Sequence, residues 1–196
     1  MALIGLTLFG WLILLAAFCA WLSTGGSGFF RQVRVGQHGA TFRILKLRTM
    51  RVVHGEQTTA TAANDPRITR VGAILRKTKV DELPQFWNVL WGDMSVVGPR
   101  PDVPGFADQL KGDERAILQL RPGITGLASL VFRHEEDLLA KVNNPEAFNS
   151  DVIFPAKVGL NLRYLEDYTL RRDIVYILAT FVPSLRVRVA PAFTAS

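Results

Sequence analysis

The first 22 residues of the chain include a long stretch without charge. The segment ALIGLTLFGWLILLAAFCAWL, residues 2–22, contains no Asp, Glu, Lys or Arg. A helix rises ~1.5 Å per residue, so a helical run of this length reaches across the hydrocarbon core of a bilayer. We therefore predict a membrane-embedded helix over residues 1–24, followed by a single domain over residues 25–196.

Two other interpretations of this segment are weaker. A secretory signal peptide begins with a basic region, and nothing basic precedes the apolar run. A helix buried in a soluble core usually carries a polar face, which this run lacks. The arginines from Arg31 onward place the chain after the helix on the cytoplasmic side, by the positive-inside rule. Hydropathy does not decide whether the helix crosses the bilayer or turns back inside it.

The charge of the chain points to anionic partners. The net charge is +6, so phosphates, acidic lipids and nucleic acids are candidates. Nucleic acid is disfavoured, because the basic residues accompany a bilayer-length segment and no nucleic-acid-binding motif is present. The single cysteine, Cys19, excludes an intrachain disulfide. The three scattered histidines lack the spacing of metal ligands.

After the apolar segment the pattern predicts an α+β domain that is mostly helical. Residues 29–50, FFRQVRVGQHGATFRILKLRTM, hold two β-rich runs around a turn at residues 37–39, which is typical of a hairpin. Residues 52–64 are small and polar and predict a loop. Asp65 and Pro66 are residue types favoured at the N-cap and first position of a helix. Helical spacing of apolar residues follows at Ile68, Val71 and Leu75.

The rest of the chain predicts helices joined by stiff loops. We expect a loop over residues 92–106, a short charged helix over 113–119 and a tight turn over 121–126. A polar connection over residues 133–151 precedes the last helices, predicted over about 155–181. In that segment IVYILATFV is apolar but too short to span a bilayer, so it lies on the membrane or packs in a core.

Two adjacent carboxylates, Asp81 and Glu82, follow a basic segment and precede Pro84. Acids near a helix start often cap it and complement its dipole, and on composition alone that interpretation is favoured. Pro84 removes residue 83 from the α region, so the pair is expected at a bend, with a helix over residues 84–90. Nearby cations lower the pKa of carboxylates, which suits a nucleophile or a Mg²⁺ ligand.

Three further motifs supply groups that bind phosphate. In GPRPD the flanking prolines hold an extended backbone and aim Arg100, although a rigid loop needs no other purpose. The glycines of RPGITG let backbone amides approach a phosphate, or simply form a turn. In KLRTM, period-two alternation places Lys46 and Arg48 on one face of a strand, where ordinary surface charge is the alternative. The aromatic run that includes Trp87 and Trp91 belongs to a core helix or to a membrane interface.

Taken together, these motifs resemble the bacterial sugar transferases, the monotopic polyprenyl-phosphate phosphoglycosyl transferases. The resemblance rests on residues 29–50, on DPRITRVGAILRKTKVDELPQFWNVLWGDMSVVGPRPD and on LRPGITG, in this order. It extends to the C-terminal helices and covers most of the chain. The length resembles that of the small members that hold only the catalytic domain.

The resemblance implies that a phosphosugar passes from a UDP-sugar to polyprenyl (undecaprenyl) phosphate at the cytoplasmic face of the bacterial inner membrane. Asp81 matches the nucleophile that forms a covalent phosphosugar intermediate and releases UMP. Glu82 matches the second acid, which binds Mg²⁺ together with Asp81. The remaining matched positions bind phosphate or belong to the nucleotide loop: Lys46, Arg48, Arg76, Arg100 and Arg121 for phosphate, Gly123 and Thr125 for the loop.

One feature departs from the family. Its membrane helix usually contains a Ser-Pro pair that kinks it into a re-entrant hairpin, and here Gly10 and Trp11 occupy those positions. Glycine favours a kink less than proline does. We expect a re-entrant helix, with a full span as the alternative. A non-catalytic membrane scaffold or an anionic-lipid-binding protein is the rival function. Self-association is compatible with the sequence, which does not identify the sugar.

Overall fold

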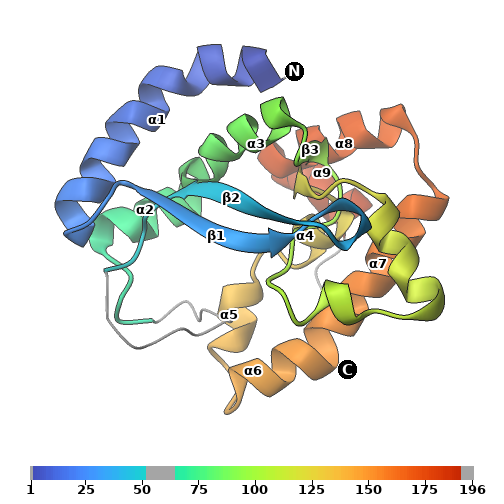
Figure 1. The fold of residues 1–196 in the computed structure, drawn as a ribbon. Coiled ribbons are helices and arrows are strands. Elements are labelled where there is room, and N and C mark those ends of the chain that lie inside the picture. The colour runs from blue at the N-terminus through green and yellow to red at the C-terminus, as the bar shows by residue number, and fades with distance from the viewer. Residues whose placement is uncertain (1, 52–64, 191–196) are drawn as a thin grey trace.

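The computed structural model describes residues 2–51 and 65–190 (Figure 1). These residues are mostly helical, with two small two-stranded sheets, which confirms the predicted α+β class. The predicted loop over residues 52–64 lies outside the described residues.

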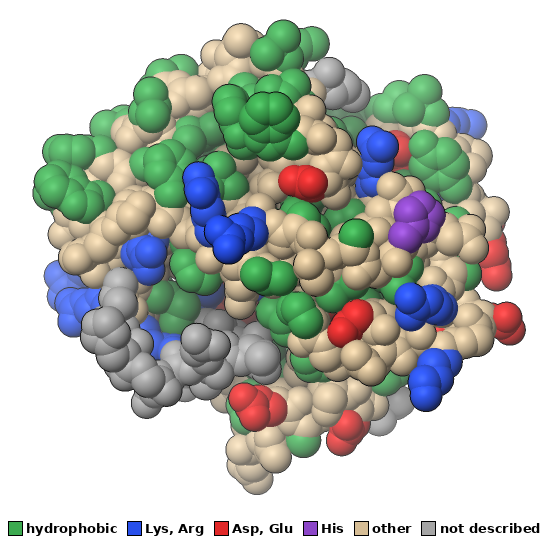
Figure 2. Space-filling model, in the orientation of Figure 1, with side chains coloured by type: hydrophobic (Ala, Val, Ile, Leu, Met, Phe, Trp, Pro, Cys, Tyr) green, Lys and Arg blue, Asp and Glu red, His purple; other side chains and the backbone are tan. Residues whose placement is uncertain are grey.

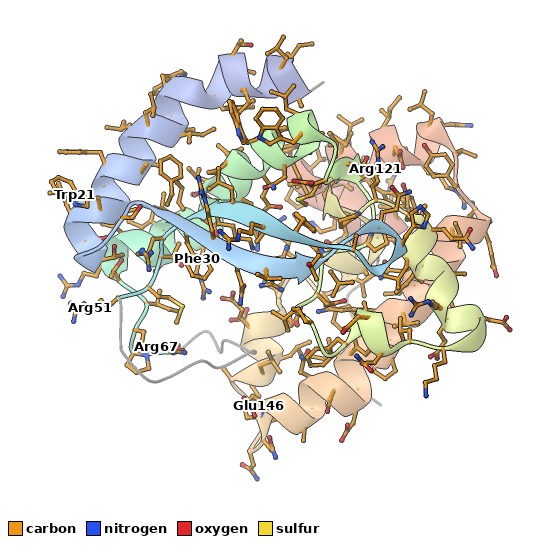
Figure 3. All side chains as sticks on the ribbon, in the orientation of Figure 1. Trp21, Phe30, Arg51, Arg67, Arg121 and Glu146 are labelled. Atoms are coloured by element: carbon orange, nitrogen blue, oxygen red, sulfur yellow. The ribbon has the colours of Figure 1, made fainter. Side chains whose placement is uncertain are left out.

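The N-terminal helix α1 (Ala2–Thr24) is confirmed. Its small residues Ala16, Ala17 and Ala20 face inward and pack with Leu47 and Leu75. Its large apolar residues face outward: Leu3, Ile4, Leu8, Trp11, Leu14, Leu15, Phe18, Trp21 and Leu22 are exposed. Figure 2 shows hydrophobic side chains gathered over this part of the molecule, and Figure 3 shows Trp21 at its outer edge. An exposed apolar surface of this extent is typical of a membrane contact rather than of a soluble core helix. The re-entrant path stays a prediction.

The predicted hairpin is also confirmed. Strands β1 (Phe29–Val35) and β2 (Thr41–Leu47) pair antiparallel, with Phe29 opposite Leu47 and Val35 opposite Thr41. The turn between them is a short 3-10 segment, η1 (Gln37–Gly39), in which His38 and Gly39 both have positive φ. The hairpin lies across the face of the molecule between α1 and the C-terminal helices (Figure 1).

The start of the next helix was predicted wrongly. Helix α2 (Arg70–Thr78) begins after Thr69, whose hydroxyl accepts a hydrogen bond from the Gly72 N–H at 2.9 Å. Asp65 instead accepts hydrogen bonds from the backbone and guanidinium of Arg67, and Ile68 bridges to Met50. The sequence thus offers two N-cap residues, Asp65 and Thr69. Thr69 forms the helix start, next to the point where Gly72 packs closely on the Thr49 backbone.

A bend at Lys79 carries the chain from α2 into the carboxylate pair. Lys79 adopts the left-handed conformation with φ 60°, and its N–H caps the carbonyl groups of Arg76 and Leu75. The 3-10 segment η2 (Val80–Gln85) follows, so the predicted bend exists. The predicted helix start at Pro84 is wrong: Pro84 lies inside η2, and α3 (Phe86–Trp91) begins after it. Pro84 is thus the fifth residue of η2, beyond the first turn in which proline is best tolerated.

Helix α3 is fastened on two sides. The Asn88 side-chain oxygen accepts from the Leu45 N–H at 2.9 Å, and its amide donates to the Arg43 carbonyl at 2.8 Å, tying α3 to β2. On the other side the Phe86 ring packs at the Cα of Gly5, where a Cβ would lie 3.0 Å from the ring. Trp87 and Trp91 are exposed, as expected at a membrane interface rather than in a core.

Two predicted loops each contain a strand. Strand β3 (Ser95–Val97) pairs in parallel with β4 (Gly123–Thr125). The pairing brings Gly98 against Gly123 and Gly126, and a Cβ on Gly123 would lie 2.1 Å from the Gly98 nitrogen. Because this close approach excludes side chains, glycine is required at these positions.

The C-terminal half forms a layer of helices on the far side of the hairpin (Figure 1). The predicted helix near residues 113–119 is present as a 3-10 segment, and the predicted polar connection over 133–151 contains two short helices. The predicted last helices are present as two separate helices, with a third beyond them. The remaining elements are η3 (Ala107–Gln109), η4 (Gly112–Gln119), α4 (Leu127–Val131), α5 (Glu135–Leu139), α6 (Pro145–Phe148), the π-helix η5 (Asn149–Ile153), α7 (Phe154–Glu166), α8 (Leu170–Phe181) and α9 (Pro183–Val189).

The core interpretation of the apolar segment in α8 is confirmed for one face of the helix, and contact with the membrane stays a prediction. Tyr176 and Ala179 are buried in a core cluster, whereas Ile174, Leu178 and Phe181 are exposed. The helix thus packs through one face and leaves a second apolar face uncovered.

Candidate active site

The carboxylate pair lies in η2, buried between α1, β2 and the proline-rich loop. Asp81 is 8% exposed and Glu82 is 7% exposed. The left-handed Lys79 turns η2 away from the axis of α2, so that successive carboxylates face basic side chains from distant parts of the chain.

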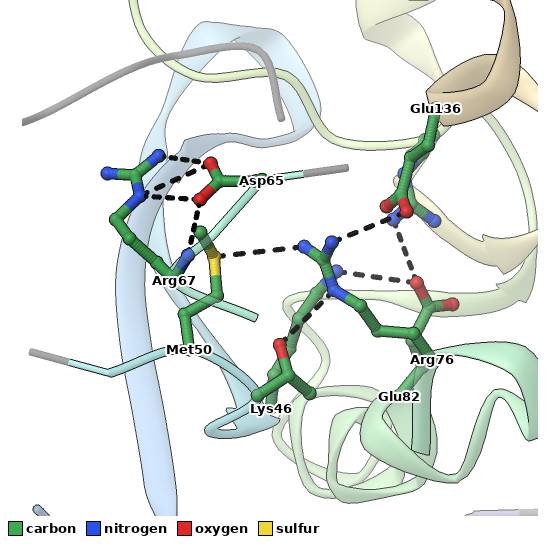
Figure 4. Close-up of polar contacts among 9 residues, drawn as sticks. Lys46, Met50, Asp65, Arg67, Arg76, Glu82 and Glu136 are labelled. Carbon is green, nitrogen blue, oxygen red and sulfur yellow. Dashed lines mark hydrogen bonds and ion pairs between the residues drawn. The ribbon is translucent and has the colours of Figure 1, made fainter. Parts of the chain in front are cut away.

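Glu82 is held by two cations. Its Oε1 accepts a hydrogen bond from Arg100 Nη2 at 2.8 Å and from Lys46 Nζ at 3.4 Å (Figure 4 shows Lys46 and Glu82). Burial on its own would raise the pKa of Glu82. The opposing charges of Arg100, Lys46 and Lys79, with the hydrogen bond from Arg100, outweigh burial and hold that pKa well below its usual range. Glu82 is therefore a stable anion.

Asp81 has the opposite character. Burial, followed by the negative charge of Glu82, raises the pKa of Asp81 to about 6, although Lys46, Lys79 and Arg100 oppose the shift. Its Oδ1 is buried without a hydrogen-bond partner among the described residues. The expectation that nearby cations lower both pKa values is thus wrong for Asp81, because those cations are nearer to Glu82. A carboxylate that is desolvated and unbonded retains its nucleophilicity once ionised.

The cations around Glu82 are themselves perturbed. Burial, together with the charge of Arg100, lowers the pKa of Lys46 to about 8. Glu82 raises the pKa of Arg100 above its usual value, so Arg100 stays charged at every accessible pH. Behind them, Arg34 donates to the Pro101 carbonyl at 3.1 Å and fixes the loop that carries Arg100. Arg34 was not predicted as a site residue.

Arg76 lies on the opposite side of the pair, at the end of α2. Its Nε donates to Thr49 Oγ1 at 3.2 Å, and its Nη1 contacts Glu136 Oε2 at 3.3 Å (Figure 4). Arg76 lines the cavity described below, but its guanidinium contacts an acid of α5 rather than either member of the pair, and its role in binding phosphate stays a prediction.

Two predicted phosphate-binding residues are engaged elsewhere. Strand β2 ends at Leu47, so Arg48 departs from the face of Lys46: its Nε donates to the Ser27 carbonyl at 2.8 Å, and its guanidinium lies over the Phe30 ring. Arg121 is exposed beside the hairpin turn, where its Nε contacts Gln37 Oε1 at 3.4 Å (Figure 3). The structure does not bring either guanidinium to the carboxylate pair.

The predicted nucleotide loop supports the backbone next to Arg100. The Gly123 N–H donates to the Pro99 carbonyl at 2.8 Å, and the Gly98 N–H donates to the Thr125 carbonyl at 2.9 Å. The Thr125 hydroxyl pairs with that of Thr180 at 2.8 Å. In this structure these residues fix the direction of the Pro-Arg-Pro segment.

A cavity of about 430 Å³ opens beside the pair, between α2, α4, α5 and α7. Arg76, Lys79 and Arg100 are among its lining residues, and Arg100 connects the cavity to the pair through its hydrogen bond to Glu82, whereas Asp81 and Glu82 do not themselves line it. Four further lining residues are Asp102, Glu135, Lys157 and Asn161, and Lys157 Nζ bonds both oxygens of Glu135, at 2.8 and 2.7 Å. None of these four residues was predicted, because they belong to segments whose proximity only the fold creates. The i, i+4 spacing of Lys157 and Asn161 was the one signal available.

The carboxylate pair fits a Mg²⁺ ion. Asp81 Oδ1 is an orphaned buried oxygen, and both hydrogen bonds to Glu82 use its Oε1, leaving Oε2 free of protein donors. Mg²⁺ is usually held by one or two carboxylates and by substrate phosphates. No group of three or more His, Cys, Asp or Glu side chains suited to a metal occurs among the described residues.

Comparison with known proteins places the chain in a defined family. A profile described as bacterial sugar transferase matches residues 1–186. The UDP-glucose:undecaprenyl-phosphate glucose-1-phosphate transferase of Caulobacter vibrioides is 40% identical over 182 residues, which cover 91% of this chain and 64% of that protein. The exopolysaccharide production protein ExoY of Rhizobium meliloti is 34% identical over 195 residues, covering 91% of this chain and 79% of ExoY.

A third relative differs in its sugar. The UDP-N-acetylgalactosamine-undecaprenyl-phosphate N-acetylgalactosaminephosphotransferase of Aeromonas hydrophila is 36% identical over 184 residues, which cover 91% of this chain and 40% of that protein. The chain thus spans less than two thirds of the length of the Caulobacter and Aeromonas relatives.

Proposed function

Because the chain belongs to the bacterial sugar transferase family, we propose that it transfers a sugar phosphate from a UDP-sugar to polyprenyl phosphate. The observation that carries the proposal is the contrast within the buried pair. Asp81 is unbonded at Oδ1, while Glu82 is anchored by Arg100 and Lys46. A scaffold or a protein that binds anionic lipid through charge alone gains nothing from burying two adjacent acids.

In the first half of the proposed reaction, an Asp81 oxygen attacks the β-phosphorus of the UDP-sugar. The bond from that phosphorus to the bridging oxygen breaks, and the oxygen leaves with UMP. The sugar phosphate remains on the carboxylate as a mixed anhydride. Arg76 and Arg100 border the cavity next to the pair and supply positive charge where the diphosphate places its negative charge.

In the second half, an oxygen of polyprenyl phosphate attacks the same phosphorus, and the Asp81 carboxylate is released. The product is a polyprenyl diphosphate sugar. A carboxylate with a pKa of about 6 is a better leaving group than a hydroxyl and remains ionised at neutral pH, so it serves both halves.

Asp81 and Glu82 are the residues that would hold Mg²⁺ here. When bound, the ion supplies Lewis-acid neutralisation of the diphosphate charge. Lys46 keeps Glu82 oriented, and Arg100 both orients it and faces the cavity. The pair thus divides its work: Asp81 reacts, and Glu82 stays a fixed anion.

The membrane placement supports two substrates of different solubility. The outward apolar face of α1 and the exposed Trp87 and Trp91 of α3 support a membrane contact, which we propose is with the cytoplasmic face of the bacterial inner membrane. A lipid-linked acceptor then approaches in the bilayer, while the nucleotide sugar enters from water. This step would begin the assembly of a glycan on its lipid carrier.

The proposed two-step course is tested by a burst experiment. The chain in lipid nanodiscs is mixed with Mg²⁺ and individual UDP-sugars, without polyprenyl phosphate, and UMP is measured. We expect about one UMP per protein molecule with the correct sugar, and continued release only after polyprenyl phosphate is added.

The matched control is Asp93→Asn, which changes an acid just beyond α3. It is expected to retain the burst. Absence of UMP release from every UDP-sugar, with folded protein and acceptor present, would refute the transferase assignment. Steady release that needs the acceptor from the first turnover would refute the covalent intermediate alone.

A further inference from the structure

Two arginines of the C-terminal half, Arg133 and Arg186, lie near enough for the charge of one to act on the other. Arg133 comes two residues after α4, and Arg186 lies in α9. Burial, followed by the positive charge of Arg186, lowers the pKa of Arg133, and the charge of Glu82 opposes this shift. Among the described residues, neither arginine of this arginine pair forms an ion pair with an acid.

Four other cations of the site do contact an acid: Lys46 and Arg100 contact Glu82, Arg76 contacts Glu136, and Lys157 contacts Glu135. Arg133 instead donates from Nη1 to the Thr180 carbonyl at 3.2 Å. The Nε of Arg186 is buried without a hydrogen-bond partner among the described residues. Two guanidiniums in a partly desolvated place repel each other, and a buried donor without a partner costs free energy. A bound anion would offset both costs, so the arginine pair indicates an anion site.

The arginine pair is held at the corner between α8 and α9. Val182 ends α8 and is also the N-cap residue of α9. Thr180, whose carbonyl holds Arg133, pairs its hydroxyl with that of Thr125 in β4 at 2.8 Å. Strand β4 in turn supports the loop that carries Arg100, and Arg133 itself is among the residues that line the cavity. The corner is therefore joined to the proposed reacting centre through packed structure.

Apolar side chains are exposed at the same corner. Phe181 is 78% exposed and Val182 is 42% exposed, and both directly follow Thr180. Val187, the neighbour of Arg186 in α9, is 72% exposed. Exposed apolar side chains beside a charged site are typical of contact with an amphiphile. A nucleotide fits them less well, because its ribose and phosphates are polar.

The charge of the arginine pair also distinguishes among lipid phosphates. A phosphate monoester carries about 1.5 to 2 negative charges at pH 7, whereas the phosphodiester of a membrane phospholipid carries a single one. Two guanidiniums therefore match a monoester better, and arginine can bind phosphate through two parallel hydrogen bonds. Polyprenyl phosphate is such a monoester and carries an apolar chain.

We propose that Arg133 and Arg186 bind the phosphate of the polyprenyl phosphate acceptor, whose chain lies along the exposed apolar side chains of the α8–α9 corner. The inference rests on the proposed function. No bond forms or breaks at the arginine pair. It holds the acceptor before an oxygen of its phosphate attacks the phosphorus on Asp81, and Arg133 joins this site to the cavity.

The test separates the two halves of the proposed reaction. The chain in phosphatidylcholine nanodiscs is mixed with Mg²⁺ and the accepted UDP-sugar, the UMP burst is measured, and polyprenyl phosphate is then titrated. For Arg186→Ala we expect the KM for polyprenyl phosphate to rise about tenfold, because a charge-assisted hydrogen bond is lost. The burst amplitude and the KM for the UDP-sugar should stay within about twofold of the wild type. Arg186→Lys keeps the charge and should recover part of the loss.

Arg188→Ala is the matched control, because it removes an exposed arginine from the same helix, and it should leave the KM for polyprenyl phosphate unchanged. Phe181→Ala is an independent variant in case Arg186→Ala does not fold. It changes an exposed side chain, and should raise the KM for polyprenyl phosphate about threefold but leave that for the short farnesyl phosphate unchanged.

Three results would overturn the inference. The first is a KM for polyprenyl phosphate at the wild-type value in both Arg186→Ala and Phe181→Ala. The second is an equal rise in the KM for the UDP-sugar, which would assign the arginine pair to the donor. The third is a loss confined to nanodiscs that contain phosphatidylglycerol, which would show that a membrane phospholipid binds there. A wild-type chain without a UMP burst or turnover would instead refute the proposed function.

Discussion

Two acids near Arg100 differ in their hydrogen bonding. Glu82 receives hydrogen bonds from Arg100 and Lys46, whereas the carboxylate of Asp102, two residues after Arg100, has no hydrogen-bond partner among the described residues. Glu82 is buried and Asp102 is half-buried, both near arginines, and their hydrogen bonding differs because Arg100 points toward Glu82. In the proposed reaction, the cations bonded to Glu82 lie close to the charged phosphates of the substrate.

The largest expected effect comes from removing the reactive member of the pair. Asp81→Asn keeps the shape of the side chain but not its nucleophilicity, so UMP release should fall at least ~10³-fold. The variant should also be more stable, because a buried unbonded carboxylate is lost. Turnover and thermal unfolding in nanodiscs check both outcomes. Residual turnover above ~1% would place the nucleophile elsewhere.

The same variant tests the sign of the pKa shift. The pKa of Asp81 is raised to about 6 in the folded protein, above its ordinary value of 3.8. Between these values the folded state holds a proton that the unfolded state has released. The wild type should therefore lose stability relative to Asp81→Asn as pH rises from about 4 to about 6, and the difference should stay constant above that. A difference that is largest below pH 4 would contradict the shift.

The next largest expected loss of activity distinguishes Arg100, which is bonded to Glu82, from the exposed Arg121. Arg100→Ala removes the short hydrogen bond to Glu82 and one cation of the cavity, and we expect kcat/KM to fall ~10²-fold. Arg121→Ala removes an exposed guanidinium and should change kcat/KM by less than about threefold. UMP-release kinetics on both variants provide the comparison. Equal losses would show that Arg121 reaches the substrate in a conformation different from this one.

The pH profile gives a moderate effect with a defined cause. Activity should fall below about pH 6, where Asp81 takes up a proton, and above about pH 8, where Lys46 loses one. Lys46→Arg keeps the cation, so its upper limit should move to higher pH while the lower limit stays. Initial rates from pH 5 to 10 check this. An unchanged upper limit would exclude Lys46 as its origin.

The smallest effect concerns Arg76. Glu136 is half-exposed and its contact with Arg76 is 3.3 Å, so releasing that contact should change the free energy of binding by only ~0.5 kcal/mol. Glu136→Gln should lower the KM for the UDP-sugar about twofold, because phosphate no longer competes with an acid for the guanidinium. Donor titration at fixed acceptor measures it, with Asp137→Asn as the control on the same helix. A raised KM would mean that Glu136 contacts the substrate itself.

The sequence predicts the local elements of this protein better than its long-range contacts. The apolar helix, the hairpin and the bend at the carboxylates follow from patterns within about 20 residues. The different pKa values of Asp81 and Glu82 do not, because they depend on which acid meets Arg100, 18 residues away along the chain. The separation of Arg48 from Lys46 likewise depends on where β2 ends, which pairing with β1 decides.

Dependence on long-range contacts also explains why the strands within the two predicted loops were missed. Strands β3 and β4 are three residues each, too short for alternation to be recognised, and their pairing needs three glycines from two segments. The unpredicted cavity residues Asp102, Glu135, Lys157 and Asn161 come from the proline-rich loop, α5 and α7, and no motif connects them. The sequence therefore predicts the carboxylate pair, which is the proposed reacting centre, but not these cavity residues.

The inward face of α1 has a consequence for how the protein is made. During synthesis α1 leaves the ribosome before β2, α2 and α3, the segments that later pack on Ala16, Ala17, Ala20 and Gly5. In the proposed placement it enters the bilayer first and then serves as the template on which η2 is positioned. Helix α1 therefore contributes side chains to a hydrophobic core in addition to its proposed role as a membrane anchor. A truncated chain that lacks residues 1–24 would expose Leu47 and Leu75 to solvent. We expect it to aggregate rather than to form an active enzyme in solution.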